Sequence, residues 1–581
     1  MFLSHNDPPC MLAGKDSCNR YQGLQERLGQ TFDPYGMITT LWRAQAAWRD
    51  HPQEAMQASQ HLANEWLALV QHSWMRALGM PSEDVVASHP EDSRFADPVW
   101  TDSPTWDIVK QWYLLYTHWL QDHLYETPGL SEAERRRGAF WMRTVLNALA
   151  PTNFLFSNPV AMQKAVTSGG QSLQHGLQMF LHDWRAGDIS MTDTRPFKVG
   201  QNLGTTPGQV VFRNRLLEVI QYLPATDKVR AVPVVIVAPW INKYYILDLT
   251  SKKSLVKWLT EQGFTVFITS WKNPDAAMRD VTLDDYIVEG IDQIVNVARS
   301  ICRSDQVNLA GYCLGGTGVS IYMAWLARKF SDPAAMPVAS WTLFTTLTDF
   351  SKAGDIEVFI DEGGLQAIGR MMDSKGYLDG KEMASSFRML RSNSLIWHYW
   401  VHNYLYGETP PAFDVLYWNM DTTRMPARMH AFYLREFYLN NRLVQPDALT
   451  IAGEPIDLAR IRLPLYAVGC EEDHIAPWRQ TFRISQRVQG PVRYTLSSSG
   501  HILGIVNPPV NPPKRAFWSG EAQGQADPDS WKLGLSQQAG SWWGDWRDWL
   551  LASAGAEVPP PAASRRYRKL ADAPGQYVQE H

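Results

Sequence analysis

A short segment flanked by glycines places a cysteine where a nucleophile would be expected. Gly311-Tyr312-Cys313-Leu314-Gly315 has the G-x-S-x-G pattern of a nucleophile on a sharp turn between a strand and a helix, with cysteine in place of serine. Small residues two positions on either side let the chain make this turn without a steric clash. The pattern predicts covalent catalysis by the Cys313 thiol, although small residues can also surround a buried cysteine by chance.

A thiol nucleophile needs a base and a carboxylate that orients the base, and later segments supply both. The acidic residues Glu471, Glu472 and Asp473 follow directly after the apolar run "LPLYAVGC". His501 follows the run "VRYTLS". The order Cys313, Asp473, His501 is that of an α/β-hydrolase triad. We prefer Asp473 for its offset from the strand end and the "HIAPW" turn after it, while Glu472 and a non-catalytic acidic loop stay open as alternatives.

Backbone N–H groups near the turn could stabilise the oxyanion of an acyl-transfer intermediate. The amide of Leu314, directly after the nucleophile, is one expected donor. The second donor is expected in the loop after "VVIVAPW", where we choose the amide of Ile241. The N-terminus of the helix after the turn would favour the thiolate form of Cys313.

From about residue 231 the sequence alternates short β-branched runs with amphipathic patterns. "VPVVIVAPW", "TVFITSW" and "QVNLAG" predict buried strands, and "SWTLFTTLTDF" and "LPLYAVGC" predict two more. Between them, "SKKSLVKWLTEQG", with Ser251 as the expected N-cap, and "LDDYIVEGIDQIVNVARSIC" predict helices. This alternation is typical of a parallel sheet covered on both faces, and with the triad order it predicts an α/β-hydrolase core.

The patterns divide the chain into three parts. Residues 1–200 are expected to form an all-helical N-terminal domain, because segments such as "WDIVKQWYLLYTHWLQDHL" have helical apolar spacing. Residues 201–555 are expected to form the catalytic domain, with a helical cap inserted at about 350–440; an unrelated packing subdomain is the alternative. Residues 556–581 are rich in proline and alanine and are expected to be a flexible tail.

Composition argues against several functional classes. The 581 residues carry a formal net charge of -5 with both signs mixed, so no nucleic-acid partner is expected. The apolar runs are shorter than the ~18 residues of a transmembrane segment, and the N-terminus lacks the pattern of a secretory signal. Cysteine spacing indicates neither disulfides nor zinc; the five cysteines are Cys10, Cys18, Cys302, Cys313 and Cys470. We therefore expect a soluble protein of the reducing cytoplasm that holds no metal.

Other residues with chemical potential receive a structural interpretation. His398 and His402 are four residues apart, but no glutamate follows the first one as a zinc-protease motif requires. His474 adjoins Asp473, and its side chain is expected to point away from that neighbour. Tryptophans such as those of "SWWGDWRDW" could form a surface for an apolar product, but such residues more often pack in the core.

Longer motifs resemble those of one family. They are "FKVGQNLGTTPGQVVFRN", "PWINKYYILDL", "SWKNPD", "GYCLGG", "LRSNSLIWHYWVHNYL", "YWNMDTTRMP", "REFYLNNRL", "EDHIAPW" and "SGHI". Together they are similar to the polyhydroxyalkanoate (poly-beta-hydroxybutyrate) synthases, and most similar to the single-subunit class I type. The similarity runs from about Asp92 to near residue 578, and the first ninety residues, with Cys10 and Cys18, lie outside it.

The resemblance implies an acyltransferase that polymerises (R)-3-hydroxyacyl-CoA, with 3-hydroxybutyryl-CoA the expected substrate, and releases CoA. In that family the elbow cysteine, the aspartate of "EDHIAPW" and the histidine of "SGHI" are catalytic, which corresponds to Cys313, Asp473 and His501 here. No cofactor is implied beyond the CoA thioester substrate. A homodimer, granule-associated partner proteins and a location at the surface of cytoplasmic polyester granules are implied as well.

Two other functions stay open. A thioesterase or polyester depolymerase could use the same triad and fold, and it would produce free hydroxy acid instead of polymer. A non-catalytic protein could coat hydrophobic granules through its aromatic surface. In that case Cys313 would be incidental, and its thiol would be inert to alkylation near neutral pH.

Overall fold

The contacts within the chain define two compact units. The computed structural model describes residues 33, 36–89, 92–525, 527–562 and 564–581, so Cys10 and Cys18 lie outside the described residues. The helical unit comprises Met1–Met191, Val358–Ile368 and Phe387–Pro410. The sheet unit comprises Thr192–Glu357, Gly369–Ser386 and Pro411–His581.

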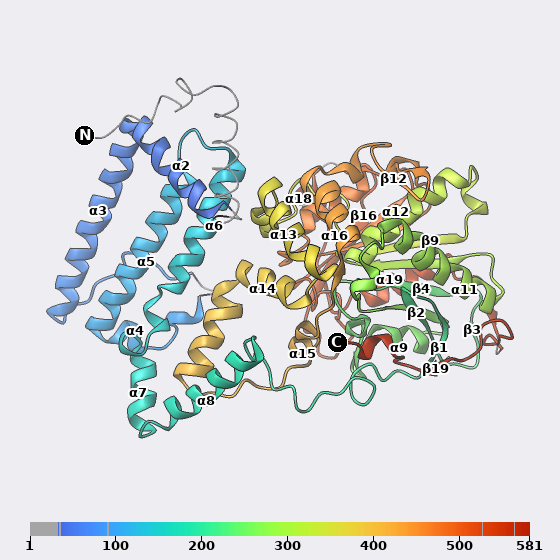
Figure 1. Ribbon diagram of the computed structural model, residues 1–581, viewed down its shortest axis with the longest axis horizontal. Helices are drawn as coiled ribbons and strands as arrows, with labels where there is room; N and C mark the ends of the chain where they lie inside the picture. The colour runs from blue at the N-terminus through green and yellow to red at the C-terminus, as the bar shows by residue number, and fades with distance from the viewer. Residues whose placement is uncertain (1–32, 34–35, 90–91, 526, 563) are drawn as a thin grey trace. The chain divides into compact units, whose positions relative to one another are not determined.

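Helices, most of them amphipathic, build the helical unit, as the apolar spacing of its sequence predicts (Figure 1). They are α2 (Met37–Asp50), α3 (Pro52–Ala77), α4 (Val99–Asp102), α5 (Pro104–Tyr125), α6 (Glu132–Ala148), α7 (Pro159–Thr167) and α8 (Gln171–Ala186). Helix α6 begins with a capping box in which the Ser131 hydroxyl accepts from the Glu134 amide and the Glu134 carboxylate accepts from the Ser131 amide. Of all the helices in the described ranges, none is long and apolar enough to cross a membrane.

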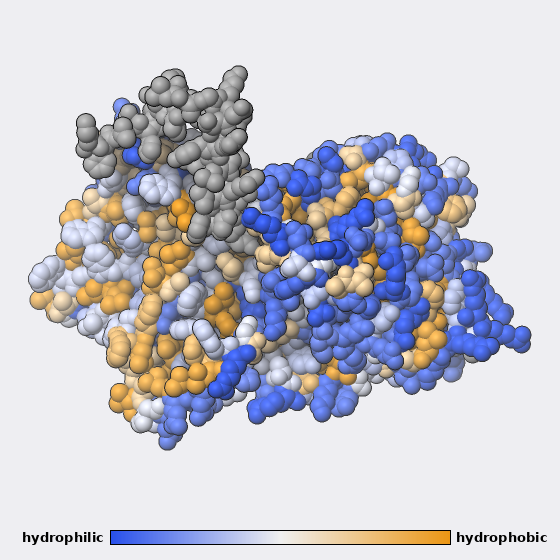
Figure 2. Space-filling view, in the orientation of Figure 1, coloured by the Kyte–Doolittle hydropathy of each residue, from blue (hydrophilic) through white to orange (hydrophobic). Residues whose placement is uncertain are grey.

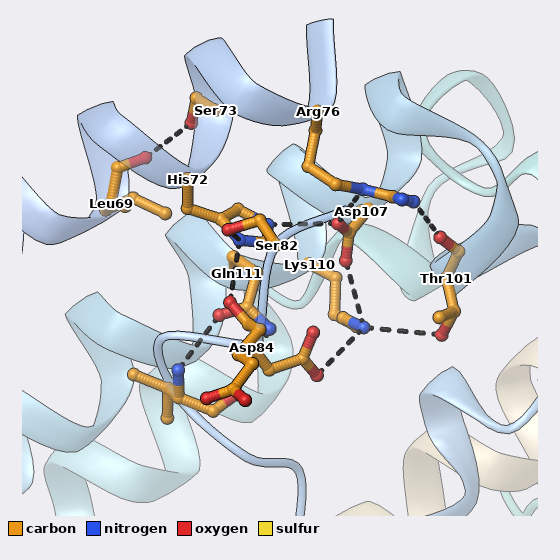
Figure 3. A network of polar contacts seen from close by, with 12 residues as sticks. Leu69, His72, Ser73, Arg76, Ser82, Asp84, Thr101, Asp107, Lys110 and Gln111 are labelled. Atoms are coloured by element: carbon orange, nitrogen blue, oxygen red, sulfur yellow. Dashed lines mark hydrogen bonds and ion pairs between the residues drawn. The ribbon is translucent and has the colours of Figure 1, made fainter. Parts of the chain in front are cut away.

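A buried polar network joins α3 and α5 (Figure 3). His72 Nε2 lies 3.0 Å from Asp107 Oδ2, and the same carboxylate accepts a 2.8 Å hydrogen bond from Arg76 Nε. Lys110 Nζ lies 3.1 Å from Asp107 Oδ1. Because the carboxylate of Asp107 is paired with several donors, burying these charged groups inside a helical bundle is physically tolerable.

Part of the insertion expected as a cap belongs to the helical unit. The insertion segment η10 (Trp400–Leu405) packs on α8, where the Tyr404 hydroxyl donates a 2.6 Å hydrogen bond to Asp183. Gly176 of α8 allows this contact, because a Cβ there would collide with the Tyr404 carbonyl oxygen. The insertion is therefore divided between the two units, whereas composition alone led us to expect one cap at about 350–440.

A single mixed sheet forms the centre of the second unit, with the strand order β17-β16-β15-β14-β9-β8-β4-β7-β2-β1-β19. The parallel strands at its centre are β15 (Val492–Ser497), β14 (Leu465–Cys470), β9 (Val338–Phe344), β8 (Val307–Tyr312), β4 (Val234–Val237) and β7 (Val266–Trp271). Antiparallel strands extend both edges: β17 (Gln538–Ala539), β16 (Ala516–Glu521), β2 (Leu217–Tyr222), β1 (Gly208–Arg213) and β19 (Ala571–Asp572). The carboxyl ends of the parallel strands meet at one edge of the sheet, where ligands bind in open α/β sheets.

Helices cover the sheet and bury its apolar side chains. Those used below are α9 (Leu255–Glu261), α11 (Asp292–Cys302), α12 (Leu314–Lys329) and α19 (Trp543–Leu551). Helix α9 is capped by Ser254, whose hydroxyl accepts from the Lys257 amide, and not by the expected Ser251. On α19, Trp546 is fully buried and donates a 3.0 Å hydrogen bond to Thr342 of β9. The "SWWGDWRDW" cluster therefore packs largely in the core.

The expected flexible tail, residues 556–581, is instead paired with the sheet unit. Strand β18 (Glu557–Val558) pairs with β3 (Val229–Arg230), and β19 pairs with β1. The carboxylate of Glu218 on β2 accepts hydrogen bonds from the amides of Gln576 and Tyr577. These partners lie more than 300 residues earlier in the chain, so the composition of the segment alone did not reveal them.

Candidate active site

Cys313 stands between β8 and α12 in a strained backbone conformation, with φ 52° and ψ -121°. The glycines around it are required by space. A Cβ at Gly311 would collide with Gly316, and one at Gly315 would collide with the carbonyl oxygen of Val237. A strained residue on a strand-to-helix turn is the geometry of a nucleophile elbow, which lifts the side chain above the edge of the sheet.

The loop after β9 holds the backbone of Cys313. The Cys313 amide donates a 2.9 Å hydrogen bond to the carbonyl oxygen of Phe344, the last residue of β9. The Thr346 hydroxyl lies 3.4 Å from the Cys313 carbonyl oxygen and 3.0 Å from that of Phe344. The Cys313 side chain is partly buried against the core. These contacts hold the backbone of Cys313 in place, while part of the residue stays accessible to solvent.

Asp473 and His501 meet at the same edge of the sheet, after β14 and β15. His501 Nδ1 lies 2.7 Å from Asp473 Oδ2, and both residues are buried. The other carboxylate oxygen, Oδ1, accepts hydrogen bonds of 2.8 and 2.9 Å from the amides of Ile475 and Ala476. Asp473 is therefore anchored by its own loop, 471–477, which we name the acid loop, and it orients the imidazole.

The electrostatics of His501 connect it to Cys313. Burial disfavours the charged imidazole, but the charges of Asp473 and Cys313 and the hydrogen bonds to both raise the pKa of His501 well above its ordinary value. The ring of Tyr312, the residue before the cysteine, stacks on His501 with centroids 5.7 Å apart. A protonated imidazole beside a thiol stabilises the thiolate.

The neighbouring acidic residues have other contacts. Glu471 forms an ion pair with Lys532, and the Glu472 amide donates a 3.1 Å hydrogen bond to the Ser499 carbonyl oxygen. The carboxylate that pairs with His501 is that of Asp473. The choice of Asp473 over Glu472 as the orienting acid thus agrees with the geometry, and its catalytic role stays a prediction.

The two expected oxyanion donors lie at the start of α12 and in the loop after β4. Leu314 is the first residue of α12, so its amide has no intrahelical acceptor four residues earlier. Ile241 lies in the loop after β4, next to Trp240, whose carbonyl oxygen accepts a 3.0 Å hydrogen bond from Thr423. Their role as donors stays a prediction.

Sequence reasoning did not single out the aromatic side chains beside the cysteine. Four aromatic rings pack together beside the cysteine, and we name them the aromatic wall: Phe350, Tyr433, Phe437 and Tyr438. Phe350 lies in the loop after β9, and the other three lie in α16 (Ala427–Tyr433) and η11 (Leu434–Leu439). Burial raises the pKa of Tyr433 and of Tyr438, and the charge of Cys313 contributes to both shifts, so both phenols lie near the thiol. Their signals in the sequence are the abundance of aromatic residues in the insertion and the motif "REFYLNNRL", which contains Phe437 and Tyr438.

His398 and His402 belong to the helical unit, whereas the triad residues belong to the sheet unit. Their rings are 4.3 Å apart, and His402 Nδ1 lies 2.6 Å from Glu408 Oε2. Within the described part of the chain, no group of three or more His, Cys, Asp and Glu side chains is arranged to hold a metal ion.

Comparison with known proteins gives the family. Residues 91–259 match the model described as Poly-beta-hydroxybutyrate polymerase (PhaC) N-terminus, and residues 246–508 match the alpha/beta hydrolase fold model. A poly(3-hydroxyalkanoate) polymerase of Methylorubrum extorquens is 40% identical over 548 residues, which cover 93% of this chain and 89% of the relative. This chain belongs to the poly(3-hydroxyalkanoate) polymerase family.

Another member of the poly(3-hydroxyalkanoate) polymerase family, the polymerase subunit PhaC of Cupriavidus necator, is 42% identical over 494 residues. That alignment covers 84% of this chain and 83% of the relative. Among solved structures, a Paleococcus ferrophilus monoacylglycerol lipase aligns with 58% of this chain and 98% of its own, with 13% identity and a TM-score of 0.31. The predictions of the family and of an α/β-hydrolase fold with a helical N-terminal region are confirmed for this polymerase-family chain.

Proposed function

We propose that this chain polymerises (R)-3-hydroxyacyl-CoA thioesters into a polyester, with release of CoA and with Cys313 carrying the acyl group. One observation carries the proposal: His501 contacts the buried Asp473 carboxylate and also Cys313 at the strained end of β8. The names of the relatives, poly(3-hydroxyalkanoate) polymerases, support the same reaction class.

A thiol suits a polymerase whose substrate is a thioester. Attack by the Cys313 thiolate on a thioester gives a second thioester of similar energy, so the acyl group stays reactive toward a hydroxyl. A serine at this position would form a more stable oxygen ester, which is a poorer acyl donor. The cysteine at the elbow thus favours transfer between successive acceptors.

In the first half of the cycle, the Cys313 sulfur attacks the thioester carbonyl carbon and the bond from that carbon to the CoA sulfur breaks. The oxyanion that forms would be stabilised by the amides of Leu314 and Ile241. The departing CoA thiolate takes a proton from the His501 imidazolium. Asp473 holds the ring in the orientation that this transfer needs.

In the second half, the 3-hydroxyl group of another bound unit attacks the acyl group on Cys313. His501, now neutral, takes the hydroxyl proton, an ester bond forms and the carbon–sulfur bond to Cys313 breaks. The cysteine thiolate is regenerated, and repetition lengthens the polyester. Water would compete with the hydroxyl, so the buried rings of the aromatic wall serve to exclude it from the thiol.

The product separates this function from hydrolysis. We expect (R)-3-hydroxybutyryl-CoA to yield free CoA and a high-mass polyester, with both lost in Cys313→Ala. The matched control is Cys302→Ala, which removes a thiol in α11 outside the triad and should retain turnover. Free CoA with only free hydroxy acid would instead assign the chain to the thioesterases or depolymerases, and no CoA release together with an inert Cys313 thiol would favour a granule-coating role.

A Cys313→Ser variant tests the chemical reason for the thiol. We expect it to become acylated slowly and then to stall, because its oxygen ester is a weaker acyl donor than the thioester. Mass spectrometry of the peptide that contains residue 313 would detect the trapped acyl group. Sustained polymer formation by this variant would contradict the proposed role of the thioester intermediate.

We further propose, following the family resemblance, that the chain works at the surface of cytoplasmic polyester granules and that the helical unit contacts them. Leu177, Leu181 and Trp184 form one apolar stripe on α8 with exposures of 58%, 43% and 75%. Figure 2 shows further apolar side chains over the helices of this unit. An exposed apolar face of this kind is typical of an interaction site. The homodimer and granule-associated proteins stay predictions of the resemblance.

Partition onto polyester particles tests this location. Replacing the three stripe residues by glutamine should lower particle binding about tenfold or more, since burying one leucine side chain stabilises by roughly 1.5–3 kcal/mol. Turnover of the water-soluble substrate should stay unchanged. Gln178→Ala, an exposed polar position of the same helix, is the matched control. Unchanged particle binding of the triple variant would contradict the role of the stripe.

A further inference from the structure

Asp349 connects three segments that surround Cys313. It follows β9 by five residues, and its side chain is 1% exposed. Its carboxylate accepts five hydrogen bonds, from the Ser351 amide (3.0 Å), Asn441 Nδ2 (3.0 Å), Gln480 Nε2 (3.0 Å), an Arg483 guanidinium nitrogen (3.0 Å) and an Arg487 guanidinium nitrogen (2.9 Å). A carboxylate with this many partners fixes the relative positions of the segments that supply them.

Two of these partners, Gln480 and Arg483, lie in the helical segment that follows the acid loop. Gln480 lies in α17 (Trp478–Thr481), which begins directly after that loop, and it also donates a 2.8 Å hydrogen bond to the Asp349 carbonyl oxygen. Arg483 lies in the next turn, η14 (Phe482–Gln486). The position of this helical segment therefore fixes where the acid loop ends, and this affects where the carboxylate of Asp473 meets His501.

Another partner connects Asp349 to the aromatic wall. Asn441 comes two residues after η11, and its side-chain oxygen accepts a 2.8 Å hydrogen bond from the Phe350 amide. The Phe350 ring in turn packs on Tyr438, with centroids 4.9 Å apart. Asn441 has a φ of 45°, a left-handed conformation that asparagine tolerates better than most residues.

The segment that carries Asp349 is itself bound to the nucleophile, through the contacts of Phe344 and Thr346 with the Cys313 backbone. Although burial raises the pKa of Asp349, the hydrogen bonds from Ser351, Arg487 and Asn441 outweigh burial and hold the pKa below its ordinary value. The carboxylate thus stays ionised over the pH range of an enzyme assay.

We infer that Asp349 is a positioning residue, which fixes the positions of the acid loop and the aromatic wall relative to Cys313. This inference deepens the proposed function and rests on it, because these positions matter only if Cys313 reacts. Asp349 itself acts through Asp473 and His501 on one side and through Phe350 and Tyr438 on the other. Small misplacements of this kind can slow a reaction about 100-fold.

Asp349→Asn tests the inference, because it keeps the shape and removes the charge. We expect kcat for CoA release to fall about 10- to 100-fold with KM nearly unchanged. The matched control is Asp529→Asn, which breaks an exposed two-hydrogen-bond pair with Arg479 of the same helix α17 and should retain wild-type kcat. An Asp349→Asn enzyme with wild-type kcat would overturn the inference.

A double-mutant cycle separates positioning from general loss of structure. If Asp349 acts on turnover through Asp473, the Asp349→Asn effect should largely disappear in an Asp473→Asn background. If Asp349 only stabilises the fold, Asp349→Asn should lower kcat by the same factor in both backgrounds. That decrease should also follow the loss of thermal stability. That second outcome would refute a positioning role.

Two further measurements keep the inference testable if Asp349→Asn does not fold or if the proposed function fails. Asn441→Gly keeps the left-handed backbone and removes only the contacts to Asp349 and Phe350; a severalfold fall in kcat is expected, and none would count against the inference. Iodoacetamide labelling of Cys313, followed by mass spectrometry of its peptide, needs no substrate. Slower labelling of Cys313 in Asp349→Asn than in Asp529→Asn would support the inference even if wild-type protein made no polymer, and equal labelling would count against it.

Discussion

Each unit of this chain contains a buried histidine–aspartate pair, and the two pairs look alike at the level of distances. His72 Nε2 lies 3.0 Å from Asp107 in the helical unit, and His501 Nδ1 lies 2.7 Å from Asp473 in the sheet unit. All four side chains are at most 9% exposed. The pairs differ in what contacts the remaining atoms of each ring and carboxylate.

His72 has partners on both ring nitrogens. Its Nδ1 lies 2.9 Å from both the Ser82 hydroxyl and the Glu83 carbonyl oxygen. In the sheet unit, His501 uses Nδ1 for Asp473, and its ring also contacts Cys313, which stands partly accessible on a strained turn. A buried pair of this type thus becomes a candidate for catalysis only when a reactive group lies beside the ring.

The largest expected difference between the pairs is in turnover. His501→Gln should lower CoA release about 10²- to 10⁴-fold, because the proposed acid and base is lost. His72→Gln should leave turnover unchanged, because its partners are all structural. Release of CoA thiol from saturating 3-hydroxybutyryl-CoA measures both. Equal losses in the two variants would show that the comparison does not separate chemistry from folding.

The next largest effect is on the stability of the helical unit. Asp107→Asn leaves Arg76 and Lys110 without a buried counter-charge and should destabilise the unit by about 3–5 kcal/mol. Hydrogen exchange of the amides of α3 and α5 measures this loss locally. Asp473→Asn, the matched change in the other pair, should leave exchange in these helices unaltered. Unaltered exchange in Asp107→Asn would mean that the network contributes little.

The two pairs also differ in how far sequence predicts them. Residues Cys313, Asp473 and His501 each follow an apolar strand, and parallel strands bring their carboxyl ends to one edge, so spacing along the chain was enough to propose their meeting. His72 and Asp107 lie on two helices, 35 residues apart, with no local pattern. Their contact depends on how α3 packs on α5, which helical periodicity does not determine.

The same limit applies to other elements. Short, mainly apolar runs predicted β4, β7 and β8 well, because a central parallel strand is buried on both faces. The edge strand β19, the junction at Asp349 and the aromatic wall depend on partners distant in sequence. Composition reports what a segment could bury, and tertiary packing decides which partner it finds.

A smaller effect, on the pH dependence of stability, should distinguish the sheet-unit pair. The folded pKa of His501 is raised, so the pair contributes stability that is fully present below the unfolded pKa of about 6.5 and is lost as pH rises through the folded pKa. A tenfold difference in proton affinity between the folded and unfolded states corresponds to about 1.4 kcal/mol. The stability advantage of wild type over His501→Gln should therefore decrease from pH 6 upward in denaturant titrations. Asp473→Asn should flatten this dependence, and an advantage that grows with pH would contradict the raised pKa.

The smallest expected effect is on stability and comes from the hydrogen bonds to Nδ1 of His72, which has two partners. Ser82→Ala removes one hydrogen bond to Nδ1, while the carbonyl oxygen of Glu83 stays in place. Because the nitrogen keeps a partner, the loss should be only about 0.5–1.5 kcal/mol, with no change in turnover. Thermal unfolding and CoA release measured on the same sample check both parts. A loss as large as that of Asp107→Asn would show that the Ser82 hydroxyl is essential to the network, and altered turnover would connect the helical pair to the chemistry of the sheet unit.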